Sequence, residues 1–255
     1  MNVSLTLKLK RFARSTLSLM SAYGISPLRT IIALRETPRF IRDYRQFKEQ
    51  LGPQSNWAFG RTFPVLHERH EQSGNANGHY FHQDLYVARK IFLAKPNRHI
   101  DVGSRVDGFV AHVASYREIE IADIRPLDAT IPNIKFIQID LSTALDPTKK
   151  EICDSLSCLH VLEHIGLGRY GDTVAPYGYK QGFDNLVQML RQGGTLYFSV
   201  PIGRQRIEFN AHRIFGVQHL LEMFEEHKLS LKSFSYVGDD GNLVDDVTLD
   251  SNVIE

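Results

Sequence analysis

A glycine turn between a short apolar strand and a helix is the segment of this sequence best suited to bind a ligand. Residues 100–102 (IDV) have the composition of a strand end, Gly103 and Ser104 form the turn, and a helix is expected over residues 108–115. Such a turn at the carboxyl end of a strand makes an anion or ribose site. Asp123 closes the next apolar run, where a carboxylate can accept both hydroxyls of a ribose.

The turn departs from the dinucleotide fingerprint G-x-G-x-x-G at its middle position. Its frame is Gly103, Arg105 and Gly108, so the glycine that lets the backbone approach a pyrophosphate is absent. This favours a ribose-bearing ligand without a pyrophosphate, such as S-adenosylmethionine (SAM), and disfavours a nicotinamide oxidoreductase. Arg105 either crowds the methionine half of that ligand or pairs with Asp107 and leaves the pocket open. A tight turn that binds no ligand is the alternative.

A second group of chemically active side chains follows the apolar run 156–159. If residues 160–164 are helical, His160, Glu163 and His164 share one face, and His212 supplies a fourth group. A neutral His160 can take a proton from a hydroxyl, which makes these four residues catalytic candidates. We expect no resident metal, although the same set would suit a divalent ion that activates vicinal hydroxyls. An ordinary polar helix start is the alternative without chemistry.

The acceptor of such a reaction is expected under residues 165–182, a stretch with five glycines. A mobile loop with aromatic faces suits a carbohydrate and can close as a lid. The aromatic candidates are Tyr170, Tyr177 and Tyr179. The candidates for holding a phosphate, as in a nucleotide sugar or a lipid-linked glycan, are Arg204, Arg206 and Arg213. A solvated loop with scattered charge is the alternative.

Apolar periodicity predicts an alternation of strands and helices around these residues. Helices are predicted over residues 80–94, 108–115, 183–191 and 217–226, and strands over 100–102, 118–122, 136–139, 156–159, 195–200 and 231–237. This order predicts an α/β fold with a doubly wound, Rossmann-like, mostly parallel sheet that has helices on both faces. Residues 243–249 are expected to pair back as a C-terminal antiparallel hairpin.

Residues 1–78 differ from the rest and are predicted to form a basic, mainly helical extension and linker, with the α/β domain over 79–255. Residues 1–45 hold nine Lys or Arg and two acids, a charge of +7 in a chain of net +1. We expect helix breaks near residues 24–27 and at Pro38. The extension suits an anionic membrane surface, and packing on its own domain or in a homodimer is the alternative. The sequence lacks the aromatic–basic interleaving of an RNA module, so a nucleic-acid partner is disfavoured.

The cysteines and the apolar runs predict a compartment. Cys153 and Cys158 fall in one apolar run, and side chains five residues apart on a strand point to opposite faces, so no disulfide is expected. No run approaches the roughly 20 apolar residues of a membrane span, and residues 17–28 lack the apolar core of a secretory signal. We expect a cytoplasmic protein, with peripheral contact at the inner face of the membrane as an option.

Over residues 80–250 the sequence resembles class I SAM-dependent methyltransferases. The resemblance is carried by DVGS (101–104), Asp123, Asp140-Leu141, DSLSCLHVLEH (154–164) and LRQGGTL (190–196). It implies that Gly103 and Ser104 approach the methionine part of SAM and that Asp101 organises the turn from beneath. It also implies that Asp123 holds the ribose, Asp140 faces the adenine amine, and His160 faces the methyl group.

More narrowly, the sequence resembles a little-characterised methyltransferase-like family associated with bacterial surface-polysaccharide synthesis. The segments that carry this resemblance are YFHQDL (80–85) and FNAHR (209–213). It implies O- or N-methylation of a sugar or of a lipid-linked glycan precursor. A methyltransferase-like scaffold protein that has lost SAM binding through Arg105 is the alternative.

Overall fold

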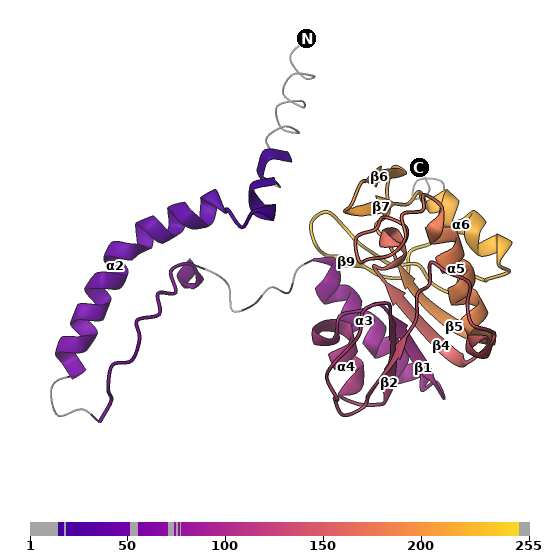
Figure 1. Cartoon of the computed structure of the whole chain (residues 1–255), viewed down its shortest axis with the longest axis horizontal. Coiled ribbons are helices and arrows are strands. Elements are labelled where there is room, and N and C mark those ends of the chain that lie inside the picture. Colours follow the sequence, from indigo (N-terminus) through magenta and orange to yellow (C-terminus); the bar gives the residue numbers. More distant parts are fainter. Residues whose placement is uncertain are drawn as a thin grey trace, which may run out of the picture. The chain divides into compact units, whose positions relative to one another are not determined.

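The structure of the chain is a computed structural model, which describes residues 15–17, 19–51, 56–70, 74, 76 and 78–249 (Figure 1). The chain divides into two units, residues 1–75 and 76–255. The division predicted from the sequence, after residue 78, stays a prediction.

The first unit is built around one long helix, α2 (Pro27–Leu51). The helix continues through Pro38, so the predicted break at that residue is wrong. Pro38 removes one backbone donor, and the Thr37 hydroxyl donates to the carbonyl of Ala33 (2.7 Å) beside it. The Phe59 ring packs edge-on against two rings of the helix, and the short helix η1 (Glu68–His70) follows.

No single helix in the described part of the chain is long and apolar enough to cross a membrane. By length and composition alone, the segments Ser15–Ala22 and Pro27–Leu51 meet the requirement together, with a bend of 69° between them.

Five parallel strands form the main sheet of the second unit, in the order β3-β2-β1-β4-β5. They are β1 (His99–Val102), β2 (Ile119–Asp123), β3 (Ile134–Gln138), β4 (Cys153–Leu159) and β5 (Leu190–Ser199). The order reverses between β1 and β4, as in a doubly wound sheet, and each of the first four strands begins within three residues of its predicted start. The predicted Rossmann-like fold is therefore confirmed.

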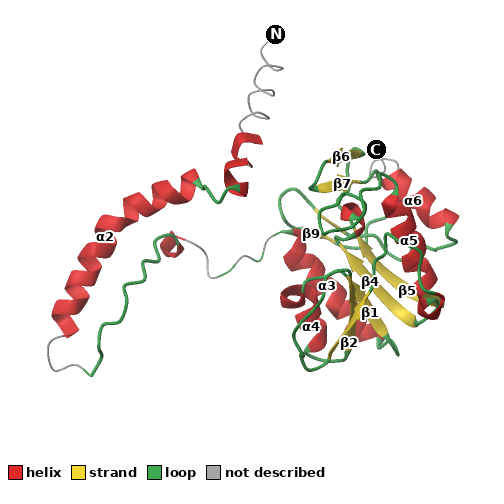
Figure 2. Cartoon of the chain, viewed as in Figure 1, coloured by secondary structure: helices red, strands yellow, loops and turns green. Residues whose placement is uncertain are grey.

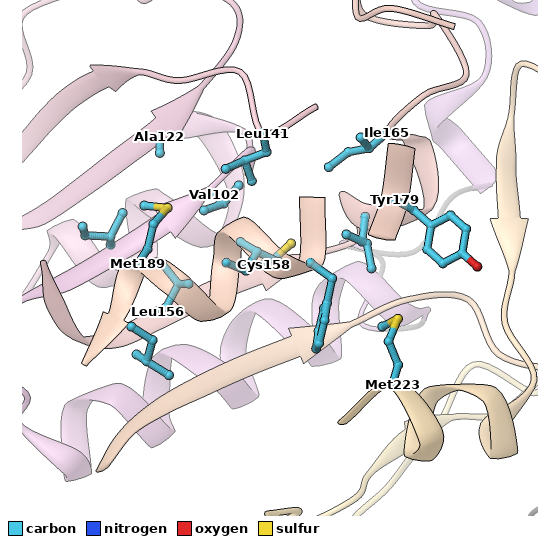
Figure 3. Close-up of a cluster of buried hydrophobic side chains, with 14 of the residues drawn as sticks. Val102, Ala122, Leu141, Leu156, Cys158, Ile165, Tyr179, Met189 and Met223 are labelled. Atoms are coloured by element: carbon cyan, nitrogen blue, oxygen red, sulfur yellow. The ribbon is translucent and has the colours of Figure 1, made fainter. Parts of the chain in front are cut away.

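Helices cover both faces of this sheet (Figure 2). On one side lie α3 (His79–Ala94), the π-helical turn η2 (Val106–Val110) and α4 (Ala111–Ala114), and on the other α5 (Gly178–Met189) and α6 (Val217–Glu226). Two short 3-10 helices, η3 (Pro147–Lys149) and η4 (Leu162–His164), lie in connections. Side chains of α5 and α6 pack on Val102, Leu156 and Cys158 of the sheet in the larger core cluster (Figure 3).

Two small antiparallel hairpins complete the second unit. The predicted C-terminal hairpin is present but short, with β8 (Tyr236–Val237) paired to β9 (Leu243–Val244) outside the main sheet. The other hairpin pairs β6 (Arg206–Glu208) with β7 (His212–Ile214) and was not predicted. Its three-residue loop places Asn210 at a φ of 62°, a left-handed conformation that asparagine tolerates.

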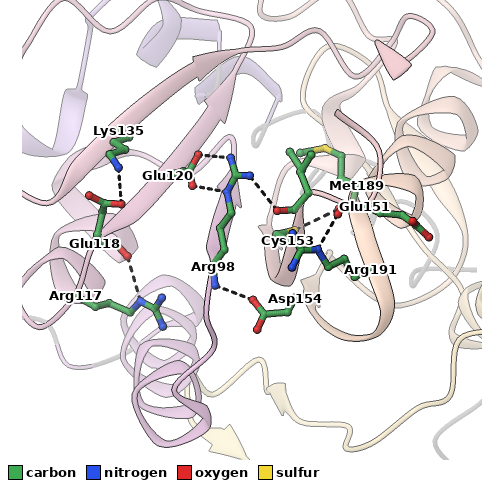
Figure 4. A network of polar contacts seen from close by, with 11 residues as sticks. Arg98, Arg117, Glu118, Glu120, Lys135, Glu151, Cys153, Asp154, Met189 and Arg191 are labelled. Atoms are coloured by element: carbon green, nitrogen blue, oxygen red, sulfur yellow. Dashed lines mark hydrogen bonds and ion pairs between the residues drawn. The ribbon is translucent and has the colours of Figure 1, made fainter. Parts of the chain in front are cut away.

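A polar network joins the amino ends of the strands (Figure 4). The Arg98 guanidinium donates to both carboxylate oxygens of Glu120 (2.6 and 2.7 Å) and to the carbonyl of Ile152 (3.0 Å). The backbone N–H of Arg98 donates to Asp154 (2.7 Å). These contacts fix the strand register at the edge opposite the carboxyl ends, so they support the fold and do not form the ligand site.

Candidate functional site

A cavity of ≈ 680 Å³ opens at the carboxyl ends of β1 to β4. Five of the six residues predicted to hold the cofactor line it, namely Gly103, Ser104, Asp123, Asp140 and His160. Ligands of open doubly wound sheets bind at this edge, beside the point where the strand order reverses. The volume falls in the range of small-molecule sites, so the cavity is large enough for a nucleoside-sized ligand.

The turn after β1 requires glycine. Gly103 has a φ of 72°, its N–H donates to the carbonyl of Ala122 (2.9 Å), and a Cβ there would lie 2.8 Å from a methyl carbon of Val161. Arg105 pairs with Asp107 at 2.6 Å, and both side chains are largely exposed. Of the two arrangements considered for Arg105, the structure therefore has the one that pairs it with Asp107.

Asp101 lies beneath this turn and does not line the cavity. It is fully buried, and its carboxylate accepts from the backbone N–H and the hydroxyl of Ser104 (both 3.0 Å) and from the hydroxyl of Ser157 (2.5 Å). Burial raises the pKa of Asp101 to about 6, although these hydrogen bonds act in the opposite direction. Asp101 therefore supports the backbone of the turn from beneath.

Buried His99 extends this network along the sheet. Its Nε2 lies 3.2 Å from the Ser157 hydroxyl and its Nδ1 lies 2.8 Å from the Ser155 hydroxyl. Since Ser157 donates to Asp101, its oxygen accepts from Nε2–H, and Nδ1 accepts from Ser155. Burial lowers the pKa of His99 to about 3, so the ring stays neutral.

The buried His99 should make the free energy of unfolding sensitive to acid. The folded pKa of about 3 lies below the ordinary value of 6.5, so the unfolded chain binds the proton more readily and stability falls as the pH drops from 6.5 towards 3. The full contribution is about 5 kcal/mol, of which about 3 kcal/mol is lost between pH 6.5 and pH 4. Urea unfolding between pH 7 and pH 4 measures this effect. The free energy of unfolding of His99→Gln should decrease less than that of wild type as the pH falls, whereas that of His112→Gln, at an exposed position, should decrease as much as wild type. Parallel curves for wild type and His99→Gln would contradict the assignment.

The Asp101 carboxyl acts in the opposite direction over part of this range. Its folded pKa of about 6 exceeds the ordinary value of 3.8, so stability falls as the pH rises from about 4 to 6. The His99 term is therefore measured as the difference between His99→Gln and wild type at each pH, because both proteins retain Asp101.

His160 ends β4 and faces the cavity beside a buried glutamate. It has a φ of 54°, and its N–H donates to the Ser199 carbonyl (3.0 Å). Its Nδ1 lies 2.9 Å from Oε1 of Glu163, which is almost wholly buried. A carboxylate accepts, so Nδ1 carries the proton and Nε2 of the neutral ring keeps its lone pair. The pair has the composition of an oriented general base.

The helix over residues 160–164 on which the grouping of these side chains was conditional does not form over its full length. Only Leu162–His164 forms a 3-10 turn, and His160 precedes it in a left-handed conformation. Glu163 nevertheless lies between the two histidines, with Nε2 of His164 at 3.7 Å from its Oε1, while Nδ1 of His164 donates to the Ala211 carbonyl (2.7 Å). His212 lies in β7 and does not line the cavity.

The alternative metal site on His160, Glu163, His164 and His212 has no support in the geometry. Among the residues that the structure describes, no three His, Cys, Asp or Glu side chains are grouped so that they could hold a metal ion.

Helix α3 supplies cavity residues from the segment YFHQDL (80–85), which the sequence analysis did not assign to the site. Tyr80, Gln83 and Asp84 line the cavity. Gln83 accepts from the Ser199 hydroxyl (2.5 Å), which fixes the helix to the end of β5. The rings of His79 and Tyr80 lie 5.1 and 5.5 Å from the ring of His160. The available signal was the spacing 80, 83 and 84, which places these side chains on one helix face just before the first strand.

Of the three predicted tyrosines, only Tyr170 lines the cavity. The guanidinium carbons of Arg125 and Arg169 lie 4.8 and 5.2 Å from the centre of its ring. Tyr177 is exposed outside the cavity lining. Tyr179 is buried, and its hydroxyl lies 3.2 Å from Nε2 of His219. The assignment of these two tyrosines to the cavity is therefore wrong.

The predicted phosphate-binding arginines also lie elsewhere. Arg213 is buried and donates to the carbonyls of Ile165 (2.6 Å) and Pro176 (3.0 Å), so it supports the loop over residues 165–177 from within. Burial also lowers the pKa of Arg213. Arg204 and Arg206 do not line the cavity, and Arg206 pairs with Glu208 (2.8 Å). The arginines that line the cavity are instead Arg105, Arg125 and Arg169.

Two further carboxylates of the cavity have partners from neighbouring residues. Asp123 accepts from the Arg125 guanidinium at both oxygens (3.0 and 2.7 Å) and from its backbone N–H (2.8 Å). Asp140 accepts from the N–H and the hydroxyl of Ser142 (2.8 and 2.6 Å). Both carboxylates are thus held in place at the ends of adjacent strands.

Known families give little further information about this chain. A family model described as "Caenorhabditis protein of unknown function, DUF268" matches residues 131–252, which is less than half of the chain. No curated protein matches the sequence.

Several solved structures have a distant likeness to the chain. One is Burkholderia thailandensis 1,6-didemethyltoxoflavin-N1-methyltransferase, with 14% identity, coverage of 87% of this chain and 89% of that one, and a TM-score of 0.47. Another is human N-acetylserotonin methyltransferase, with 12% identity, coverage of 62% of this chain and 48% of that one, and a TM-score of 0.44. A third is the methyltransferase domain of bacterial CtHen1, with 14% identity, coverage of 64% of this chain and 94% of that one, and a TM-score of 0.45. Likeness at this level does not establish an activity.

Proposed function

We propose that this protein is a SAM-dependent methyltransferase that methylates a hydroxyl or an amine of its acceptor. The observation that carries the proposal is the shared cavity at the carboxyl ends of the strands. It brings together the Gly103 turn, the carboxylates of Asp123 and Asp140, and the base candidate His160. A donor nucleoside and an acceptor group can therefore meet beside one imidazole.

The lining fits an adenosine group. Ile124, Ile139 and Leu141 give the cavity apolar walls between the carboxylates of Asp123 and Asp140. A carboxylate has about four acceptor positions on its two oxygens. Asp123 can thus accept ribose hydroxyls while it remains bonded to Arg125. When bound, SAM supplies an electrophilic methyl group, and the protein supplies alignment and a base.

His160 and Glu163 supply that base. Nε2 of His160 would take the proton of the acceptor hydroxyl, while bound SAM would supply the methyl group that replaces this proton on the oxygen. Oε1 of Glu163 accepts from Nδ1–H of His160, with 2.9 Å between the nitrogen and the oxygen, and the carboxylate stabilises the charged ring that results. The proton would then pass from His160 to solvent. The demethylated form of SAM is S-adenosylhomocysteine (SAH).

The acceptor class that we propose is a sugar or a lipid-linked glycan precursor in surface-polysaccharide synthesis, at the cytoplasmic side of the membrane. The aromatic side chains Tyr80 and Tyr170 on the cavity wall support a ring-shaped acceptor. Arg169 adjoins Tyr170 and replaces the predicted arginines as the candidate contact for an acceptor phosphate.

Calorimetric titration with SAM and SAH tests the cofactor site. Wild-type protein should bind both in the micromolar range. Asp123→Ala should weaken binding about 10- to 100-fold, because it removes hydrogen bonds between the ribose and a charged group. Asp128→Ala removes the same charge from an exposed position outside the cavity lining and should leave the affinity unchanged.

Absence of SAM and SAH binding by folded wild-type protein would contradict the proposal. The second candidate function, a methyltransferase-like scaffold protein without cofactor, would then lead. The observation that favours it is the pairing of both Asp123 oxygens with Arg125.

A further inference from the structure

The first unit exposes an unusual amount of apolar surface. None of the side chains of α2 is buried over its 25 residues. Leu28 and Leu34 are 69% and 70% exposed, and Ile31, Ile41 and Phe47 are also exposed. After the helix, Trp57 and Phe63 are 80% and 85% exposed. Side chains of this kind gathered in one unit normally mark a binding surface.

The same unit carries the positive charge of the chain. Residues 1–75 contain twelve Lys or Arg and five Asp or Glu, a charge of +7, which leaves −6 on residues 76–255 because the whole chain carries +1. Within α2, Arg39 is engaged by Glu36 (2.5 Å) and Asp43 (2.9 Å). The remaining basic residues of the helix are exposed: Arg29, Arg35, Arg42, Arg45 and Lys48.

We propose that α2 and the described segment 56–66 form a docking surface for an anionic lipid bilayer. Exposed leucine, phenylalanine and tryptophan side chains insert at the boundary between headgroups and acyl chains, while arginines and lysines meet lipid phosphates. A polyanion such as RNA would use the basic residues and leave the apolar ones exposed. Because exposed basic residues occur along α2 from Arg29 to Lys48, we place the helix along the bilayer surface.

Trp57 provides a direct probe because it is the only tryptophan of the chain. With full-length protein, vesicles of phosphatidylcholine with about 30% phosphatidylglycerol should shift the Trp57 emission to the blue and carry the protein into the pellet. Pure phosphatidylcholine vesicles should do so at least 10-fold more weakly. Added salt should weaken binding, since charges at the headgroups are screened.

Charge reversal separates this surface from the overall charge. Each basic residue near a lipid surface contributes about 1 kcal/mol, or roughly fivefold in partitioning, so Arg35→Glu, Arg42→Glu and Arg45→Glu combined should reduce binding more than 100-fold. The matched control changes the net charge equally on the second unit, through Arg89→Glu, Lys150→Glu and Lys232→Glu, and should bind within about twofold of wild type. Leu28→Asn with Leu34→Asn should weaken binding without any change in charge.

Three results would overturn the proposal. In the first, vesicles of either composition neither shift Trp57 nor carry the protein down. In the second, Trp57 emission shifts with protein concentration in the absence of lipid and sedimentation equilibrium shows a dimer, which makes the surface an interface between copies. In the third, an RNA oligonucleotide binds and anionic vesicles do not. None of these results bears on SAM binding.

Discussion

His160→Asn should slow methyl transfer about 10²- to 10⁴-fold, the usual contribution of a positioned general base. Asparagine tolerates the left-handed backbone at this position, where φ is 54°, but it cannot take the acceptor proton. The measurement is kcat on an acceptor found by screening sugars and nucleotide sugars with wild-type protein. The dissociation constant of SAH should stay within about threefold of the wild-type value.

Two further variants define the role of His160. Glu163→Gln retains an acceptor for Nδ1–H but removes the charge that stabilises the protonated ring. Its kcat should therefore fall by about 10-fold, which is less than the decrease expected for His160→Asn. His112→Ala, at an exposed position on α4, should leave kcat unchanged. If His160→Asn keeps the wild-type kcat, His160 is not the base and alignment alone drives the transfer.

The sheet could be predicted because its buried strands are short apolar runs separated by turns. The cofactor candidates followed from the same pattern, because the carboxyl ends of parallel strands meet at one edge of the sheet. Asp123 and Asp140 are 17 positions apart in the sequence, yet both line one cavity for this reason. The hairpin β6–β7 was missed because its strands are three residues long and its loop lacks glycine.

The acceptor side of the site could not be predicted, since spacing along a loop does not determine where a side chain points. Arg213 lies under the loop because carbonyls nearly 40 and 50 residues earlier in the chain, at Pro176 and Ile165, accept from it. Tyr179 falls within α5 and packs into the core, whereas Tyr170 precedes the helix and faces the cavity. These outcomes depend on tertiary contacts rather than on local sequence.

Gly166→Ala should destabilise the protein by about 3 kcal/mol or more, the range of severe backbone conflict. Gly166 lies near the start of the loop over residues 165–177 with a φ of 82°, and a Cβ there would overlap the backbone carbonyl oxygen of Ala175. That segment cannot move freely, because the N–H of Ala175 donates to Gly166 (2.9 Å) and Asp172 accepts from the Gly166 N–H (2.7 Å). Urea unfolding at pH 7 measures the loss.

Gly171→Ala separates the cost of the left-handed backbone from the cost of overlap. Gly171 has a similar φ of 87°, but a Cβ there would have no atom within 4 Å, so alanine at this position should cost only about 1–2 kcal/mol. The additional loss of stability in Gly166→Ala, compared with Gly171→Ala, measures how strongly the contacts between Gly166 and Ala175 hold the loop closed. Equal losses in the two variants would mean that residues 166–175 open readily, and the loop would then be a mobile cover rather than a fixed wall of the acceptor site.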